Sequence, residues 1–308
     1  IMSTAIISHP DCRRHQIDKL HPEQPNRIDD ISDRLIASGL EYSIDHFDAD
    51  DVLNTDLLRV HGVSYIRSLY ERIPHEGIIN IDGDTQMCAN TLKAANRAAG
   101  SGVQAVDLLM KGEHQAVFCN VRPPGHHAFR DKASGFCFYN NIAIAASHAL
   151  SLDDIERVAI IDFDVHHGDG TEDIFKDNDD VLFCSLFQHP FYPFSDPASQ
   201  HNNHIKSPMS AGEGSTEFKS LVTNSWMPAI ESFQPQLIFI SAGFDSHRND
   251  DMGHINLDDP DYAWVTQQLS QYAQNDQCLG IVSMLEGGYE QGVLGRSVLA
   301  HIRALAKL

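Results

Sequence analysis

The sequence has few cysteines and no long apolar segment. Its six cysteines lie far apart, without the C-x-x-C spacing of a metal-binding or redox pair. Most of them lie in apolar runs, where cysteine packs as a small hydrophobic residue. No apolar stretch approaches the roughly 18 residues of a membrane-spanning helix, and the first residues lack the layout of a secretory signal. We therefore expect a cytoplasmic protein with free thiols and no membrane partner.

Basic residues are also scarce. The chain has 22 Lys and Arg against 43 Asp and Glu, a formal net charge of −21. Such a charge argues against nucleic acid as a partner and permits a cationic one, although solubility alone would also explain it. The 308 residues, 42% of them hydrophobic, contain no linker-like tract or internal repeat. We expect one large core and a single domain over residues 1–308.

Short apolar runs that end in polar residues recur along the chain. They are TAIISHP (4–10), AVFCNVRPPGHH (116–127), VAIIDFDVHH (158–167), VLFCSLFQH (181–189), LIFISAGFDSH (237–247) and IVSMLEGGY (281–289). Continuous apolar runs indicate strands covered on both faces, as in parallel sheets. Helices are expected at 91–111, 140–150, 216–233, 260–274 and 290–307. This alternation predicts a doubly wound α/β fold with its ligand site beyond the carboxyl ends of the strands.

The run at 158–167 carries buried carboxylates, which need a cation, a histidine or several hydrogen-bond donors. Successive strand side chains point to opposite faces, so we expect Asp162, Asp164 and His166 to share one face of a strand that runs through 158–167. Asp164 and His166 suit Zn²⁺, and Asp245, at the end of another run, is the third candidate ligand. If the D-x-H spacing is considered alone, the alternative to metal binding is that Asp164 and His166 form a structural ion pair or a cap.

Two further run ends carry groups for proton transfer. A loop stiffened by Pro and Gly presents His126 and His127, and imidazole titrates near neutral pH. Either Asp162 or Asp169 could fix the tautomer of one of these histidines. Tyr289 follows two glycines that allow close approach to a ligand, so its hydroxyl could donate to a developing oxyanion.

Together these motifs resemble the zinc-dependent histone deacetylase family, which includes bacterial amidohydrolases. The matching motifs are HPEQPNR (21–27), RPPGHHA, SGFCFYNNIAIAA, DFDVHHGDGT, SAGFDSH and LEGGY. HPEQPNR and Glu286 resemble class II, whereas Asp169 resembles class I. The resemblance implies the arginase/deacetylase fold, a three-layer α/β/α sandwich around a parallel sheet.

The resemblance also implies residue roles. Asp164, His166 and Asp245 would bind one Zn²⁺. His127, assisted by Asp169, would be the general base, and His126 with Asp162 would supply charge and orientation, although the residues alone do not decide between the histidines. Tyr289 would stabilise the oxyanion. A potassium site would use Asp162, Asp164, His166, Ser185 and Leu186.

Several residues are expected to border the substrate. Phe136 and Phe191 match the aromatic walls around an acyl-lysine stem, with Gly135 and Gly288 in the adjoining turns. Met252 stands where the polyamine-selective member of the family has a glutamate, which argues against dedicated polyamine specificity. Asp82 and Asp84 are candidates for the rim, with a simple turn as the alternative. The resemblance alone implies that Arg27 lines a channel for acetate.

The expected activity is zinc-dependent removal of an acyl group, foremost acetyl, from the ε-amine of lysine in a peptide or protein. Three alternatives remain: deacetylation of acetylpolyamines or other small amides, acyl-lysine binding without catalysis, and an arginase-like enzyme with two metals. The last would need more aspartates near SAGFDSH than Asp245 alone.

Overall fold

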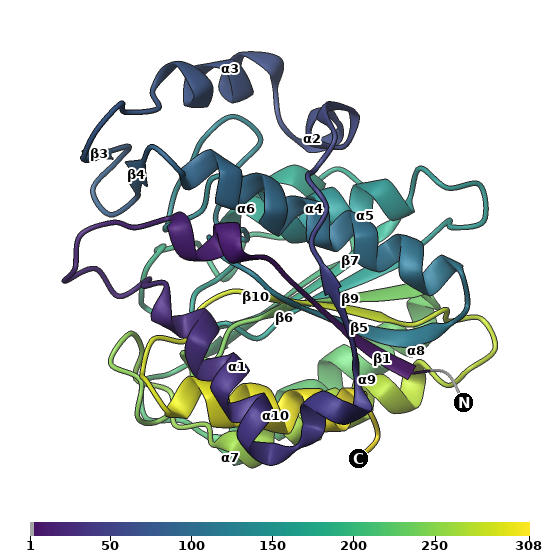
Figure 1. The fold of residues 1–308 in the computed structure, drawn as a ribbon. Coiled ribbons are helices and arrows are strands. Elements are labelled where there is room, and N and C mark those ends of the chain that lie inside the picture. Colours follow the sequence, from purple (N-terminus) through teal and green to yellow (C-terminus); the bar gives the residue numbers. More distant parts are fainter. Residues whose placement is uncertain (1–2) are drawn as a thin grey trace.

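Residues 3–308 are described by a computed structural model, which has an eight-stranded sheet at its centre (Figure 1). The strand order is β2-β1-β5-β10-β9-β6-β7-β8, and every neighbouring pair is parallel. The strands are β1 (Ser3–Ser8), β2 (Asp45–Asp48), β5 (His114–Asn120), β6 (Val158–Asp162), β7 (Val181–Gln188), β8 (His204–Met209), β9 (Leu237–Ala242) and β10 (Ile281–Leu285).

Helices cover both faces of the sheet (Figure 1). One face carries α4 (Thr91–Met110), α5 (Asn141–Ala149) and α6 (Asp169–Phe175), with α2 (Asn54–Val60), α3 (Val63–Glu71) and the hairpin β3–β4 (Ile78–Asn80, Gln86–Cys88) further out. The other carries α1 (Asn26–Ser38), α7 (Ser215–Leu221), α8 (Met227–Phe233), α9 (Asp259–Tyr272) and α10 (Val293–Leu305). Short 3₁₀ helices lie at Pro10–Arg14 and Leu40–Ser43.

The apolar runs form two cores, one on each side of the sheet. In β5, Val117 and Cys119 face the core under α4 and α5, whereas Ala116 and Phe118 face the core under α9 and α10. Because successive strand residues point to opposite faces, a strand buried on both sides must be apolar throughout. The predicted three-layer α/β/α sandwich with a parallel sheet is confirmed.

Some predicted elements differ in detail. The expected helix at 216–233 is interrupted by a π-helical turn at Val222–Trp226, next to Pro228, which has no N–H to donate. The last helix begins at Val293 rather than at residue 290, because Gly292 has a left-handed backbone (φ 74°). The edge strands β2 and β8 and the helices α1 to α3 were not predicted, since their segments lack long apolar runs.

The strand order creates a place for a ligand at the carboxyl ends of the central strands. Strands β5 and β6 are consecutive long strands of the sheet in sequence, but β10 and β9 lie between them. The carboxyl ends of these four central strands therefore meet at one place, where the connections leave a crevice.

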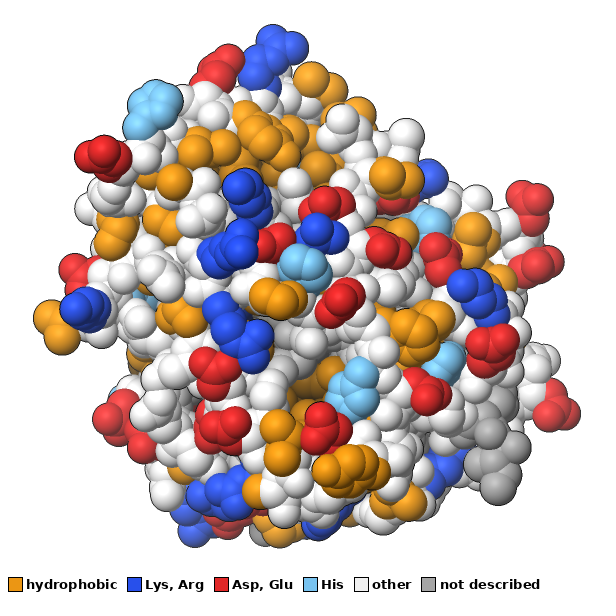
Figure 2. All heavy atoms as spheres, viewed as in Figure 1, with side chains coloured by type: hydrophobic (Ala, Val, Ile, Leu, Met, Phe, Trp, Pro, Cys, Tyr) orange, Lys and Arg blue, Asp and Glu red, His pale blue; other side chains and the backbone are white. Residues whose placement is uncertain are grey.

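Charged side chains of one sign do not gather in a single patch on the face shown in Figure 2. Acidic side chains are distributed over it with Lys and Arg between them, and hydrophobic side chains gather near the top, where α2 and α3 lie in Figure 1. Among residues 3–308, no helix is both long and apolar enough to cross a bilayer. All six cysteines are buried and unpaired.

Candidate active site

Three predicted ligands lie together at the carboxyl ends of β6 and β9. Nδ1 of His166 is 3.1 Å from Oδ1 of Asp164 and 3.2 Å from Oδ2 of Asp245. All three residues are buried, and one potential ligand atom from each lies within 4.8 Å of the others. The expectation of one continuous strand through 158–167 is wrong, because β6 ends at Asp162. Asp164 and His166 instead lie in the loop that follows, where Asp162 Oδ1 accepts a hydrogen bond from the Asp164 amide.

The cluster fits a metal ion. Oδ2 of Asp245 is buried without a hydrogen-bond partner, although Oδ1 accepts from the Val165 amide at 2.9 Å. Gly243 and Gly287 leave space beside the carboxylates, since a Cβ atom on Gly287 would overlap Asp245 and lie 2.6 Å from Oδ2 of Asp164. Two carboxylates and an imidazole are a donor set that Zn²⁺ accepts.

The electrostatics of the cluster favour a positive charge. Burial, followed by the charge of Asp164, raises the pKa of Asp245 to about 7. Burial disfavours a charged His166, yet the nearby carboxylates of Asp164 and Asp245 raise its pKa to about 10. Despite burial, the neighbouring His126 and the protonated His166 in turn hold the pKa of Asp164 below its usual value. The cluster therefore favours a bound positive charge, as expected of metal ligands.

The tandem histidines each contact one aspartate. Nδ1 of His126 lies 2.9 Å from Oδ2 of Asp162, and Nδ1 of His127 lies 2.7 Å from Oδ1 of Asp169, in the first turn of α6. The ring centroids of the two histidines are 4.1 Å apart. An Nδ1–H donated to each carboxylate leaves Nε2 as the atom available for proton transfer.

The two histidines differ in protonation. Burial opposes a charge on His126, but Asp162 and Asp164 raise its pKa well above the usual value. Burial and the neighbouring charge of His126 lower the pKa of His127 to about 4. The pair therefore combines one imidazolium with one neutral imidazole, which can accept a proton.

Glu286 holds the histidine loop, a contact that sequence reasoning did not foresee. Its Oε2 accepts hydrogen bonds from the amides of Gly125 (2.7 Å) and His126 (3.1 Å), while Oε1 accepts from the Ser241 hydroxyl (3.0 Å). This buried carboxylate therefore connects the histidine loop to the end of β9.

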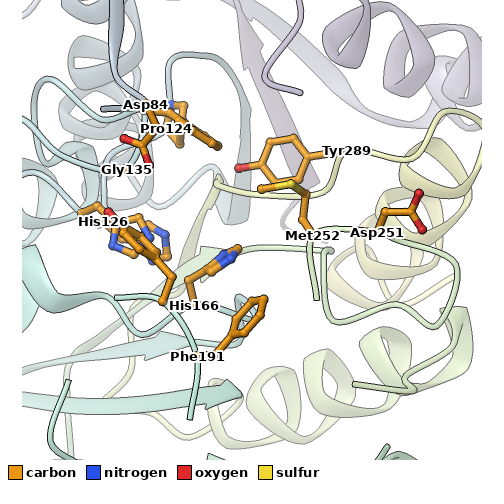
Figure 3. A pocket seen from close by; sticks show the side chains of 12 residues that line it. Asp84, Pro124, His126, Gly135, His166, Phe191, Asp251, Met252 and Tyr289 are labelled. Carbon is orange, nitrogen blue, oxygen red and sulfur yellow. The ribbon is translucent and has the colours of Figure 1, made fainter. Parts of the chain in front are cut away.

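A pocket of about 210 Å³ opens above these groups (Figure 3). Its lining residues are Asp84, Pro124, His126, His127, Gly135, Phe136, His166, Phe191, Tyr192, Asp251, Met252 and Tyr289. The lining thus includes the histidine pair, one candidate metal ligand, the tyrosine, both predicted aromatic walls and Met252.

The aromatic walls are held in place by neighbours. Phe191 stacks on His166, with ring centroids 5.7 Å apart and an interplanar angle of 17°. Phe136 has an unusual left-handed backbone (φ 70°), and its amide donates to Oγ1 of Thr85 at 3.1 Å. A Cβ atom at Gly135 would overlap the ring of His127, so only glycine allows this approach.

Other predicted residues lie at different places. Gly288 does not line the pocket; a side chain there would point at Leu294 and Phe244. Asp82 forms a turn, accepting from the amides of Asp84 and Thr85, whereas Asp84 lines the pocket.

Tyr289 points into the pocket, with Met252 beside it (Figure 3). Burial raises the pKa of its phenol well above the usual value, and Arg27, which lies 4.8 Å over the ring, only partly offsets this. The phenol therefore keeps its proton and can donate a hydrogen bond.

Tyr192 and Asp251 were not predicted to line the pocket. Tyr192 lies in the motif HPFYPF, directly after Phe191, and its ring lies 5.4 Å from that of His127. The aromatic content of this motif was the available signal. Asp251 precedes Met252 in a polar loop that offers no comparable signal.

Comparison with known proteins agrees with this geometry. The Histone deacetylase domain matches residues 21–305. The chain belongs to the histone deacetylase family. A histone deacetylase-like amidohydrolase of Pseudomonas aeruginosa is 31% identical, over 93% of this chain and 77% of the relative. The human polyamine deacetylase HDAC10 is also 31% identical, over 99% of this chain and 48% of the relative. The HD domain of HDA15 superposes with a TM-score of 0.92 at 29% identity, covering 100% of this chain and 90% of that structure.

Proposed function

We propose that this histone deacetylase-family protein hydrolyses the amide of an acylated lysine, foremost an acetyllysine in a peptide or protein, and releases acetate. The observation that carries the proposal is the buried Asp164–His166–Asp245 cluster, adjacent to a pocket that also presents a histidine pair and a phenol. Family membership supports deacylation, and the aromatic walls suit the apolar stem of lysine.

Asp164, His166 and Asp245 would hold one Zn²⁺. The ion would supply Lewis-acid polarisation of the amide carbonyl and would lower the pKa of a bound water. The protein's own residues would supply the remaining proton transfers.

His127 is the proposed general base. It is neutral near pH 7, and Asp169 fixes its Nδ1–H, so Nε2 can remove a proton from the attacking water and later return it to the leaving amine. His126, charged and paired with Asp162, would stabilise negative charge next to it. The Tyr289 hydroxyl would donate to the oxyanion.

We further propose a potassium ion at Asp162, Asp164, His166, Ser185 and Leu186. Asp162 and Ser185 are register partners on β6 and β7, which brings these two segments together at the strand ends. We also place the protein in a reducing compartment such as the cytoplasm, because its six thiols are buried and unpaired.

The substrate assignment can be tested with a panel of acetyllysine peptides, acetylputrescine and acetylspermidine, assayed with the zinc-loaded protein at physiological salt. We expect the peptides to have the higher kcat/KM, since Met252 itself offers an ammonium group only apolar contact. Asp84 and Asp251 also line the pocket, and they are the carboxylates that would act against this expectation. If acetylspermidine is turned over better than every peptide, the small-amide alternative replaces our proposal. If the metal-loaded protein binds acyl-lysine but hydrolyses none of these amides, the non-catalytic alternative holds.

A further inference from the structure

Asp250 is a buried carboxylate to which the proposed mechanism assigns no role. It lies in the loop between β9 and α9, five residues after Asp245, and the residue is 4% exposed. Within the described residues it has no Arg, Lys or His partner in an ion pair. A buried carboxylate without a cation is costly unless several hydrogen-bond donors surround it.

Three backbone amides serve as those donors. Oδ2 accepts from the amides of Tyr289 at 2.6 Å and Glu290 at 3.2 Å, and Oδ1 accepts from the amide of Met252 at 2.9 Å. One carboxylate thus binds the backbone of the proposed oxyanion donor and, through its other oxygen, the backbone of the rim residue. Both side chains line the same pocket (Figure 3).

The backbone before Tyr289 offers little stiffness of its own. Gly287 and Gly288 precede it, and Gly288 has a positive φ of 113°. Glycine places few restrictions on φ and ψ, so contacts with the rest of the protein must fix where the phenol lies. The 2.6 Å hydrogen bond to Asp250 is the contact made by the Tyr289 amide itself.

We propose that Asp250 is a positioning residue that holds Tyr289 at the oxyanion and Met252 at the rim in one fixed relation. A charged acceptor forms stronger hydrogen bonds than a neutral one, and a donor displaced by about 1 Å loses much of its catalytic effect. The proposal rests on the proposed function for its catalytic consequence, whereas the ordering of the backbone does not depend on it.

The catalytic test is a double-mutant cycle on Asp250→Ala and Tyr289→Phe. If Asp250 acts through the phenol, Asp250→Ala should lower kcat about 10-fold or more in the wild-type background and less than about 2-fold when Tyr289 is already Phe. KM for an acetyllysine peptide should change less than kcat. Equal losses in both backgrounds would overturn the proposal, since a general structural defect would act without regard to the phenol.

Asp30→Ala is the matched control. Oδ2 of Asp30 accepts from the amides of Gly292 and Gly295, both at 2.9 Å, so this variant removes two hydrogen bonds from the same segment without touching Tyr289 or Met252. We expect it to lower thermal stability and to leave kcat within about 3-fold of wild type. A loss of kcat equal to that of Asp250→Ala would show that any loosening of the segment suffices.

Asp250→Asn covers the case in which the alanine variant fails to fold. Asparagine keeps the shape of the aspartate side chain but has only one acceptor oxygen. Its NH₂ group cannot accept a hydrogen bond, so at least one of the three backbone amides would lose its acceptor. We therefore expect kcat between those of the wild type and Asp250→Ala. Wild-type kcat in Asp250→Asn would contradict the need for two acceptor oxygens.

Amide hydrogen exchange provides a test that needs no turnover. In Asp250→Ala or Asp250→Asn, the amides of Tyr289, Glu290 and Met252 should exchange faster than in wild type, while those of β10 should not change. Unchanged exchange at Tyr289 would overturn the proposal even if the enzyme is active. Faster exchange in a protein with no deacylase activity would instead support the positioning role and reject the proposed function.

Discussion

In the proposed mechanism, two imidazoles and a phenol carry out the proton transfers, and the surroundings of each group set its protonation state. His127 is kept neutral by burial and by the charge of His126, while burial keeps Tyr289 protonated. The roles are thus set by neighbouring charge and desolvation rather than by residue type.

Tyr289→Phe should lower kcat by roughly 10² to 10³, because one oxyanion donor is lost. The zinc content should be unchanged, since the phenol is not among the candidate ligands. Steady-state kinetics with metal analysis check both expectations. A variant with wild-type turnover would remove Tyr289 from the mechanism.

Met252→Glu should shift the kcat/KM ratio toward acetylpolyamines by about tenfold, or about 1.4 kcal/mol of differential transition-state binding. A carboxylate at this position would attract a secondary ammonium group, whereas methionine offers only apolar contact. Competition assays at about 0.15 M salt limit long-range attraction by the acidic protein. Met252→Gln is the uncharged control, and an equal shift in it would rule out the electrostatic explanation.

At the scale of elements, His301 ties α10 to its neighbours. Its Nδ1 lies 2.6 Å from Oγ1 of Thr266 on α9, and its Nε2 lies 2.7 Å from Oγ of Ser283 on β10. Burial lowers the pKa of His301 to about 3. The imidazole is therefore neutral in the folded protein across the physiological range.

This burial makes stability depend on pH. The folded pKa lies below the unfolded value of about 6.5, so the unfolded chain binds a proton that the folded chain does not. The contribution of His301 is complete above pH 6.5 and is lost as the pH falls toward 3. Relative to His301→Gln, the wild-type free energy of unfolding should fall by about 1.4 kcal/mol for each pH unit below about 6.

Urea unfolding of both proteins at pH 7, 6 and 5 measures this difference. The glutamine variant retains a polar side chain but cannot titrate, so other histidines cancel in the comparison. Parallel pH profiles for the two proteins would show that His301 does not remain neutral in the fold.

For the whole molecule, removal of the metal should cost stability. The carboxylates of Asp164 and Asp245 are both buried and lie around one imidazole, so a bound cation favours the folded state over the unfolded chain. We expect about one Zn²⁺ per chain after mild dialysis and a lower Tm after chelation. Elemental analysis and calorimetry check this, and two tightly held metals would favour the arginase-like alternative.

The net charge of −21 acts at this scale as well. Acidic and basic side chains intermingle on the face in Figure 2, so the charge forms no single-signed patch there. Long-range attraction of polycations is screened beyond about 8 Å at physiological ionic strength. We therefore expect the groups around the pocket, rather than the total charge, to decide between peptide and polyamine.

Much of this protein is determined by its sequence alone. Apolar runs without alternation specify strands covered on both sides, and hence the layered fold, because no other arrangement buries both faces. Parallel strands place their carboxyl ends at one edge, which is why Asp164, His166 and Asp245 could be expected together although Asp245 lies 79 positions after His166.

Tertiary structure alone decided the finer geometry. Periodicity could not show that β6 ends at Asp162, and the residues by themselves left open which aspartate contacts which histidine. The contacts of Asp250 with Tyr289 and Met252 join backbone amides from separate loops, and backbone amides are the same in every sequence. Sequence patterns report which side chains are buried and in what order, but loop paths depend on packing between segments distant in the chain, which no local pattern encodes.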